Sequence, residues 1–247
     1  MKLKEGKYYP PIMADLMGRP DNIRTKNYLL GVKKPRYPAD NNAMMKDGMI
    51  PGDYLILYSI QRKCIVMSDT PMERYTNQKF IDSAYGDVLI GGLGIGMVPA
   101  ALARNPRVKS ITIVEKDSEL IGLIGPRIKK AVTSIPIKII EGDAYTYPRN
   151  VRRTEHYDWA YIDIWDSYPG HGDLLWMLEM VKRAYSTVAD NFDAWGYEDA
   201  MTGAGNPIKT EEYKEYLKNM QAYYGRSGKI SLDLLQNGMT YMHDAGI

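Results

Sequence analysis

The sequence has almost no cysteine and little histidine, and these two scarcities exclude several classes of protein. Cys64 is the only cysteine in 247 residues, so an intrachain disulfide and a cysteine-based zinc site are both excluded. The three histidines are scattered without the spacing of metal ligands, and we expect no metal site. A chain of this length buries enough apolar surface to fold on its own hydrophobic core.

Long apolar runs and an excess of one charge are also absent. The longest uncharged run, residues 88–103, contains four glycines and a proline and is too short to span a bilayer. Residues 1–12 carry lysines but lead into no apolar stretch, so we expect no secretory signal. The 32 basic and 30 acidic residues nearly cancel, which argues against nucleic acid or a membrane as the main partner. These absences favour a soluble cytoplasmic protein.

The N-terminal part of the chain divides into two segments. Residues 1–52 contain many prolines and turn pairs, and we interpret them as an irregular cap, with a lid or a homodimer arm as the alternative. Apolar runs at 53–58 and 63–67, joined by a short link, predict a β-hairpin. Pro71 is suited to the first position of a helix that we expect to extend to about residue 84.

From residue 85 to residue 195, short apolar runs alternate with helical stretches. This rhythm predicts an α/β core with a Rossmann-like, doubly wound and mostly parallel sheet that is covered on both faces. Residues 196–247 contain a helical pattern and are expected to form a helical C-terminal extension. The expected strands of the core are 87–90, 110–115, 137–140, 157–163 and 192–195.

A glycine cluster at residues 91–96 separates the first of these strands from a helical stretch. A strand that leads into a glycine-rich turn and then a helix directs backbone N–H groups toward a ligand. The spacing is Gly-x-Gly-x-Gly, and Met97 stands where the dinucleotide fingerprint requires its third glycine. The cluster therefore indicates a ligand loop and argues against NAD or FAD, and a simple tight turn is the alternative.

An acid follows or ends each of the next three strands. Glu115 ends the second strand, Asp143 follows the third and Asp163 ends the fourth. Open α/β sheets bind ligands at the carboxyl ends of their strands, and a carboxylate after the second strand can accept ribose hydroxyls. Each acid alone is typical of a solvated loop, but together they predict a nucleoside site at this edge.

These motifs resemble those of a known superfamily. Residues 88–96, Val-Leu-Ile-Gly-Gly-Leu-Gly-Ile-Gly, are followed by Ile-Val-Glu-Lys-Asp at 113–117, Glu-Gly-Asp-Ala at 141–144 and Tyr-Asp-Trp-Ala-Tyr-Ile-Asp at 157–163. In this order they resemble the class I S-adenosylmethionine-dependent methyltransferases, and within them most closely the spermidine synthases. The resemblance covers about residues 53–190 and implies the class I methyltransferase fold.

The resemblance implies a role for each matching residue. The loop glycines would flank the methionine moiety of S-adenosylmethionine, Glu115 would hold the ribose hydroxyls, Asp143 would accept from the adenine amino group, and Asp163 would lie near the sulfonium. The product left in the site would be S-adenosylhomocysteine. The cofactor-binding residues expected on this basis are Gly91, Gly92, Leu93, Gly94, Gly96, Glu115, Lys116, Asp143, Ala144, Asp163 and Glu73.

Departures from the spermidine-synthase pattern favour methyl transfer. Those aminopropyltransferases carry an aspartate at the position of Gly94, which pairs with the ammonium of decarboxylated S-adenosylmethionine; the intact cofactor has a carboxylate, which an aspartate would repel. Ser167 also replaces the proline that usually follows the matching second acid. Ile90 occupies the place of the usual methyltransferase acid, so Glu73 or Asp69 is expected to hold the methionine ammonium.

We therefore predict a methyltransferase whose acceptor is a small molecule, with an amine favoured. Asp163 and Asp166 are the expected catalytic residues, because a carboxylate can hold an amine and take its proton. Two aromatic residues, Trp165 and Tyr168, would form walls, and His171 is a less favoured base. The alternatives are an aminopropyltransferase and a non-catalytic nucleoside-binding protein with the same fold.

Overall fold

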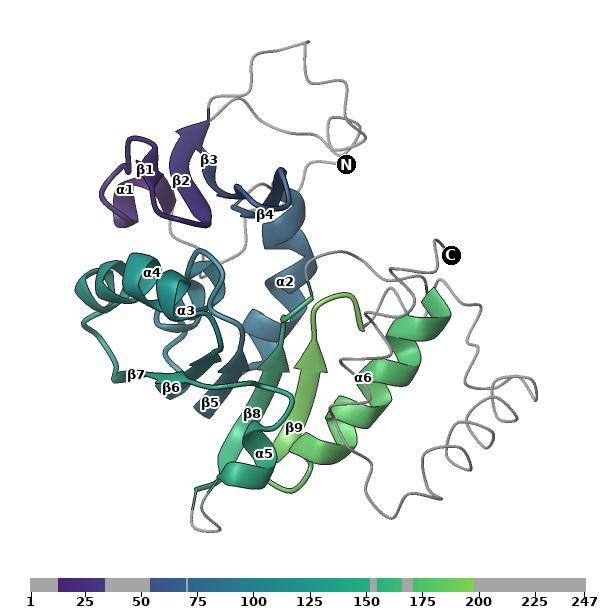
Figure 1. The fold of residues 1–247 in the computed structure, drawn as a ribbon. Coiled ribbons are helices and arrows are strands. Elements are labelled where there is room, and N and C mark those ends of the chain that lie inside the picture. The colour runs from purple at the N-terminus through teal and green to yellow at the C-terminus, as the bar shows by residue number, and fades with distance from the viewer. Residues whose placement is uncertain (1–12, 34–53, 70, 152–154, 166–170, 198–247) are drawn as a thin grey trace.

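The computed structural model describes residues 13–33, 54–69, 71–151, 155–165 and 171–197, which form two sheets with flanking helices (Figure 1). The larger sheet has five parallel strands in the order β7-β6-β5-β8-β9, so the first strand of the core lies in the middle. This confirms the expected Rossmann-like sheet. Its strands are β5 Gly86–Gly91, β6 Val108–Glu115, β7 Ile137–Glu141, β8 Tyr157–Ile162 and β9 Ala189–Ala194.

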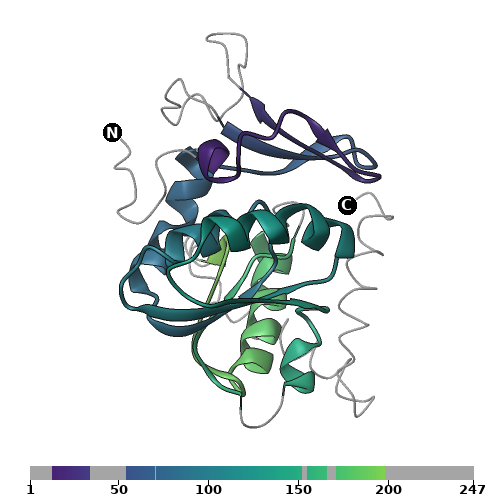
Figure 2. The same cartoon turned by 90° about the vertical axis from the view of Figure 1, so that its left-hand side faces the viewer.

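The two faces of the parallel sheet contribute to two hydrophobic clusters, because successive side chains of a strand point to opposite faces. From β5, Val88 and Ile90 pack in the cluster that includes α2, α3 and α4, whereas Leu89 packs in the cluster of α6. Figure 2 shows α4 and α6 on opposite sides of this sheet. The helices are α2 Pro71–Ser83, α3 Met97–Leu102, α4 Ser118–Ala131, α5 Tyr147–Asn150 and α6 His171–Tyr185.

The smaller sheet is antiparallel, with the strand order β1-β2-β3-β4. Its β3 Tyr54–Ser59 and β4 Cys64–Ser68 form the expected hairpin. The described part of the cap is more regular than expected, since it forms α1 Met13–Leu16, β1 Ile23–Arg24 and β2 Tyr28–Lys33. The whole of β2 pairs with β3, a partner remote in sequence, and local turn signals carry no information about such pairing.

Three expectations extend beyond the described residues. The helical extension at 198–247, and the segments of the cap at 1–12 and 34–52, lie outside them. The same is true of Asp166 and Tyr168. Within the described ranges, no helix is both long enough and apolar enough to cross a membrane.

Candidate functional site

The glycine loop leaves the carboxyl end of β5 and folds tightly against β8. Gly92, Gly94 and Gly96 have φ values of 98°, 51° and 79°, a region that L-residues with side chains rarely adopt. A Cβ added at Gly92 would overlap the backbone carbonyl oxygen of Asp163. The glycine at position 92 is therefore required by the close approach of two backbone segments as well as by its dihedral angle.

The end of β8 and the segment after β7 meet this loop. The backbone N–H of Asp163 donates to the carbonyl of Gly91 at 2.8 Å. A Cβ added at Gly91 would lie 3.0 Å from the Cβ of Ala144. Three of the segments that the sequence identified, around Gly91, Ala144 and Asp163, are thus brought together at the carboxyl edge of the sheet.

Glu115 ends β6 beneath the loop and is only 9% exposed. Its Oε2 accepts the N–H of Leu93 at 2.9 Å, and its Oε1 accepts the N–H of Asp117 at 2.9 Å. A carboxylate has about four acceptor positions, so each oxygen can accept a further donor. Glu115 therefore connects the loop to the start of α4, whereas its neighbour Lys116 is exposed.

Asp143 organises the turn after β7. Its Oδ1 accepts the N–H of Tyr145 at 2.8 Å, and its backbone carbonyl accepts the N–H of Thr146 at 3.1 Å and that of Tyr147 at 2.9 Å. The side chain is half-buried. This arrangement holds the Asp143 carboxylate in a fixed orientation in the turn after β7.

Asp163 and Glu73 form a pair of acids with raised pKa values. Burial, together with the charge of Glu73, raises the pKa of Asp163 to about 7. Burial raises the pKa of Glu73 to about 7 as well. Two desolvated carboxylates that repel one another favour a shared proton or a bound cation over two free negative charges. The pair is therefore suited to an ammonium group.

Glu73, one member of this pair, belongs to the first turn of α2. Asn77, one turn later, donates its side-chain N–H to the Glu73 carbonyl at 2.7 Å and accepts the hydroxyl of Tyr161 from β8. Tyr161 in turn stacks on Phe80 of the same helix, with 4.1 Å between ring centroids. Asn77 and Tyr161 are both almost fully buried, so they tie the first turn of α2 to the strand that ends near Asp163.

Asp69, the alternative ammonium partner, is already engaged by other groups of the protein. It is completely buried, and its Oδ1 accepts the N–H of Leu55 at 2.6 Å while its Oδ2 accepts from the guanidinium of Arg74 at 3.0 Å. A hydrogen bond from the backbone of Met13 adds to these. Arg74 and backbone N–H groups therefore already compensate the charge of Asp69, which argues against it as the partner of a cationic ligand.

The loop amides are less available than the sequence implied. Gly92 donates to Val114 O, Leu93 to Glu115, and Gly96 to Leu93 O. Among the described residues, the N–H of Gly94 is the only one in residues 92–96 without an acceptor. Four of the five N–H groups of residues 92–96 are thus already hydrogen-bonded within the protein.

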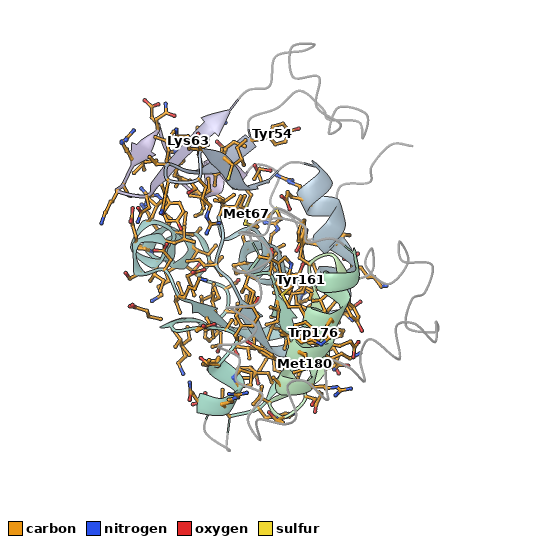
Figure 3. All side chains as sticks on the ribbon, turned by 45° about the vertical axis from the view of Figure 1, so that its right-hand side comes forward. Tyr54, Lys63, Met67, Tyr161, Trp176 and Met180 are labelled. Atoms are coloured by element: carbon orange, nitrogen blue, oxygen red, sulfur yellow. The ribbon has the colours of Figure 1, made fainter. Side chains whose placement is uncertain are left out.

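Met67 supplies the acceptor for the N–H of Ile95, and the sequence did not indicate this role. Its Sδ, 3.4 Å from the N–H of Ile95, accepts from that group, and a Cβ added at Gly94 would overlap the same sulfur. Figure 3 shows Met67 between the antiparallel sheet and the parallel sheet. Nothing in the sequence distinguishes it from the other 14 of the 15 methionines, since the contact depends on how β4 packs against the loop.

Trp165 follows Asp163 and is buried, with 7% of its surface exposed. Its indole N–H has no hydrogen-bond partner among the described residues. A buried donor of this kind usually finds an acceptor. Asp166 and Tyr168, which the sequence places beside it, lie outside the described residues, and His171 begins α6.

No family model matches the sequence, and the search of curated proteins finds no match. Similar solved structures include spermidine synthase from Thermotoga maritima, 15% identical with a TM-score of 0.42, over 70% of this chain and 55% of that one. A methyltransferase from Podospora anserina with S-adenosylhomocysteine bound is 17% identical, with a TM-score of 0.36, over 49% and 48%. An S-adenosylmethionine-dependent methyltransferase from Clostridium acetobutylicum is 12% identical, with a TM-score of 0.31, over 47% and 42%. The chain thus spans about half the length of the structures that it matches.

Proposed function

We propose that this protein is an S-adenosylmethionine-dependent methyltransferase that acts on a small-molecule amine. One observation carries the proposal: the carboxyl edge of the parallel sheet brings the glycine loop, Glu115 and Asp163 together, and Glu73 is close enough to Asp163 to raise its pKa. This is the edge at which open α/β sheets bind ligands.

The residues at this edge fit the cofactor. The free acceptor positions on Glu115 suit a pair of ribose hydroxyls, and the oriented carboxylate of Asp143 suits the amino group of adenine. Ala144 packs beside Gly91 at the same edge. Glu73 is the acid proposed for the methionine ammonium. When bound, S-adenosylmethionine supplies a methyl group that its sulfonium already activates.

Asp163 and Trp165 are the residues proposed to handle the acceptor. An amine is protonated near neutral pH and must lose a proton before its nitrogen lone pair can attack. The carboxylate of Asp163 can hold the ammonium form and accept that proton, and its pKa of about 7 suits this exchange. Trp165 excludes water on the side of the strand end, and Asp166 remains a proposed second acid for the same amine.

Aminopropyl transfer is a second candidate, and a specific observation favours it. A decarboxylated cofactor needs an acid for its bare ammonium and needs no N–H groups for a carboxylate. The loop satisfies all but one of its amides internally, and Glu73 and Asp163 together form an acidic pair. Gly94, in place of the aspartate of the aminopropyltransferases, remains the sequence feature against this candidate.

Calorimetry with S-adenosylhomocysteine tests the site. We expect micromolar binding, about −8 kcal/mol. Glu115→Ala should weaken it by about 1.5–3 kcal/mol through loss of charge-assisted hydrogen bonds. Glu141→Ala is the matched control, because Glu141 pairs with Glu115 in register and ends the neighbouring strand, but is exposed. Absence of binding, or equal effects of the two substitutions, would contradict the proposal.

The reaction is tested by competition between the two cofactors and by product analysis. Tighter binding of S-adenosylmethionine, with a methylated product from a panel of small amines, supports methyl transfer. Tighter binding of the decarboxylated form, with an aminopropylated product, overturns it in favour of the second candidate. Binding without either product would indicate the non-catalytic nucleoside-binding alternative.

A further inference from the structure

The turn between β1 and β2 contacts the start of α4. The hydroxyl of Tyr28 donates to Asp117 Oδ2 at 2.7 Å. The backbone N–H and the side-chain amide of Asn27 donate to the two carboxylate oxygens of Glu119, both at 2.7 Å. Figure 2 shows the antiparallel sheet lying over α4. The small sheet is thus fixed to this helix by three short hydrogen bonds to carboxylates.

The acceptor of the Tyr28 hydroxyl also orients Glu115. The other oxygen of the Asp117 carboxylate, Oδ1, caps α4 by accepting the N–H groups of Glu119 at 2.9 Å and Leu120 at 3.2 Å. The backbone N–H of Asp117 donates to Glu115 Oε1 at 2.9 Å. Asp117 therefore stands between the hydroxyl of Tyr28 and the carboxylate of Glu115.

The line continues from Glu115 to the glycine loop, because Glu115 Oε2 accepts the N–H of Leu93 at 2.9 Å. Four residues are thus connected in one hydrogen-bonded series from β2 to the glycine loop: Tyr28, Asp117, Glu115 and Leu93. All four are wholly or partly buried, so water competes weakly for these hydrogen bonds.

Charge explains why this series needs a donor at its outer end. Glu115, Asp117 and Glu119 place three carboxylates within five residues of sequence. Hydrogen bonds from Asn27 lower the pKa of Glu119, and burial together with Asp117 raises the pKa of the Tyr28 hydroxyl. The hydroxyl therefore stays protonated and donates to Asp117, which holds the Asp117 carboxylate in a single orientation.

We propose that Tyr28 is a positioning residue for Glu115: by holding Asp117, it fixes the carboxylate of Glu115 in the orientation that accepts two ribose hydroxyls. The antiparallel sheet thereby sets the affinity of the parallel sheet for a nucleoside. The nucleoside part of this inference rests on the proposed function, whereas the orientation of Glu115 does not.

Tyr28→Phe removes the hydroxyl alone, and Tyr58→Phe is the matched control on the adjacent strand β3, where Tyr58 pairs with Leu29. We expect Tyr28→Phe to weaken S-adenosylhomocysteine binding about fivefold, as for coupling through residues that do not touch the ligand. The 2′,3′-dideoxy analogue of S-adenosylhomocysteine lacks both ribose hydroxyls, so both variants should bind it as tightly as the wild type does. Equal losses for the two ligands, or no loss, would overturn the proposal.

Asp117→Asn provides a second variant. Asparagine retains the Oδ1 that caps α4, but it replaces the acceptor of Tyr28 with an amide. We expect the same selective loss, and no further loss when Asp117→Asn is combined with Tyr28→Phe. Additive losses would show that the two residues act independently.

Amide hydrogen exchange tests the positioning without any ligand. In the ligand-free protein, the N–H groups of Leu93 and Asp117 should exchange faster in Tyr28→Phe than in Tyr58→Phe. Unchanged exchange would overturn the positioning role even if the wild type binds S-adenosylhomocysteine. If exchange changes but the wild type binds no nucleoside, the proposed function fails and the positioning role stands.

Discussion

Two acids, Asp69 and Asp163, have contrasting surroundings. Asp69 lies just before α2, where the antiparallel sheet meets it, and accepts from Arg74 and from backbone N–H groups. Asp163 ends a strand of the parallel sheet, and the ionisable group that influences it is another acid, Glu73. Asp69 is compensated within the fold, whereas the two influences on Asp163 from the described residues, burial and the charge of Glu73, both favour a proton or a bound cation.

This contrast separates structural carboxylates from functional ones more sharply than burial does. Burial raises the pKa of Asp69 too, but Arg74 and the hydrogen bonds of Asp69 oppose that effect. At Asp163 both burial and the neighbouring charge act in the same direction. Acids that the fold leaves uncompensated are typical of sites whose compensation arrives with a ligand.

The largest expected effect on stability comes from Asp69, the acid that Arg74 compensates. Asp69→Asn removes the charge that Arg74 faces, and Arg74 is itself only 13% exposed. Loss of one partner of a buried ion pair should lower the free energy of unfolding by about 3 kcal/mol. Urea denaturation measures it, with Asp15→Asn as the control, because Asp15 pairs with Arg19 on the surface. A loss no greater than that of the control would mean that Asp69 is not a structural anchor.

The next effect distinguishes two glycines of the loop. At Gly92 an added methyl meets the rigid carbonyl of Asp163, whereas at Gly94 it meets the flexible end of Met67. We expect Gly92→Ala to lower the free energy of unfolding by about 3 kcal/mol and Gly94→Ala by about 1 kcal/mol, mainly through backbone strain. Gly122→Ala, in an open position on α4, should stabilise the protein by about 0.5–1 kcal/mol. Equal losses at positions 92 and 94 would contradict the described packing of the loop.

The parallel core could be predicted from the sequence because its signals are local. Apolar runs, a glycine-rich turn and an acid at the strand end occur together along the chain, and Glu115 and Asp163 lie at the sheet edge that this pattern indicates. The roles of Met67 and Tyr28 could not be predicted in this way. Each depends on how the antiparallel sheet packs on the core, and that packing joins residues separated by 28 and 89 positions.

The same limit applies to Asp69 and Glu73, at the start of α2. Glu73 and Asp69 are four positions apart, and the sequence offered both as partners of an ammonium group. Only the fold shows that Leu55 and Arg74 engage Asp69. Whether an acid is compensated is a property of its three-dimensional neighbours, so spacing along the chain does not decide it.

A smaller effect on stability is expected from pH, through the carboxylate of Asp163. Because the pKa of Asp163 is raised from 3.8 to about 7, the folded protein binds its proton more tightly than the unfolded chain does. Stability from this group is complete below about pH 4 and is lost as the pH rises through about 7. Asp163→Asn should therefore be more stable than the wild type above pH 7, by about 1 kcal/mol or more.

Thermal unfolding of the ligand-free protein between pH 4 and pH 8 measures this difference. Asp82→Asn, at an exposed position, is the control against which the pH dependence of Asp163→Asn is compared. For the wild type, binding of a cationic ligand should tighten as the pH rises through 7, because the acid pair must release a proton to receive it. A pH-independent difference between Asp163→Asn and the wild type would place Asp163 on the compensated side.

The smallest effect concerns Met67, where the antiparallel sheet contacts the glycine loop. Its thioether occupies the N–H of Ile95, which a ligand carboxylate would otherwise use. Met67→Ala removes both the acceptor and the bulk, whereas Met67→Leu removes the acceptor and keeps the bulk. The quantity measured is the ratio of the affinity for S-adenosylhomocysteine to the affinity for its decarboxylated form. We expect Met67→Ala to raise this ratio about threefold over the wild type, through one charge-assisted hydrogen bond. Met67→Leu should show no such gain.

The control is Met177→Leu, which removes the thioether acceptor of Tyr145 from α6 and should leave the ratio unchanged. If Met67→Ala leaves the ratio of the two affinities unchanged, the carboxylate of the ligand does not reach the loop, and that result would favour aminopropyl over methyl transfer.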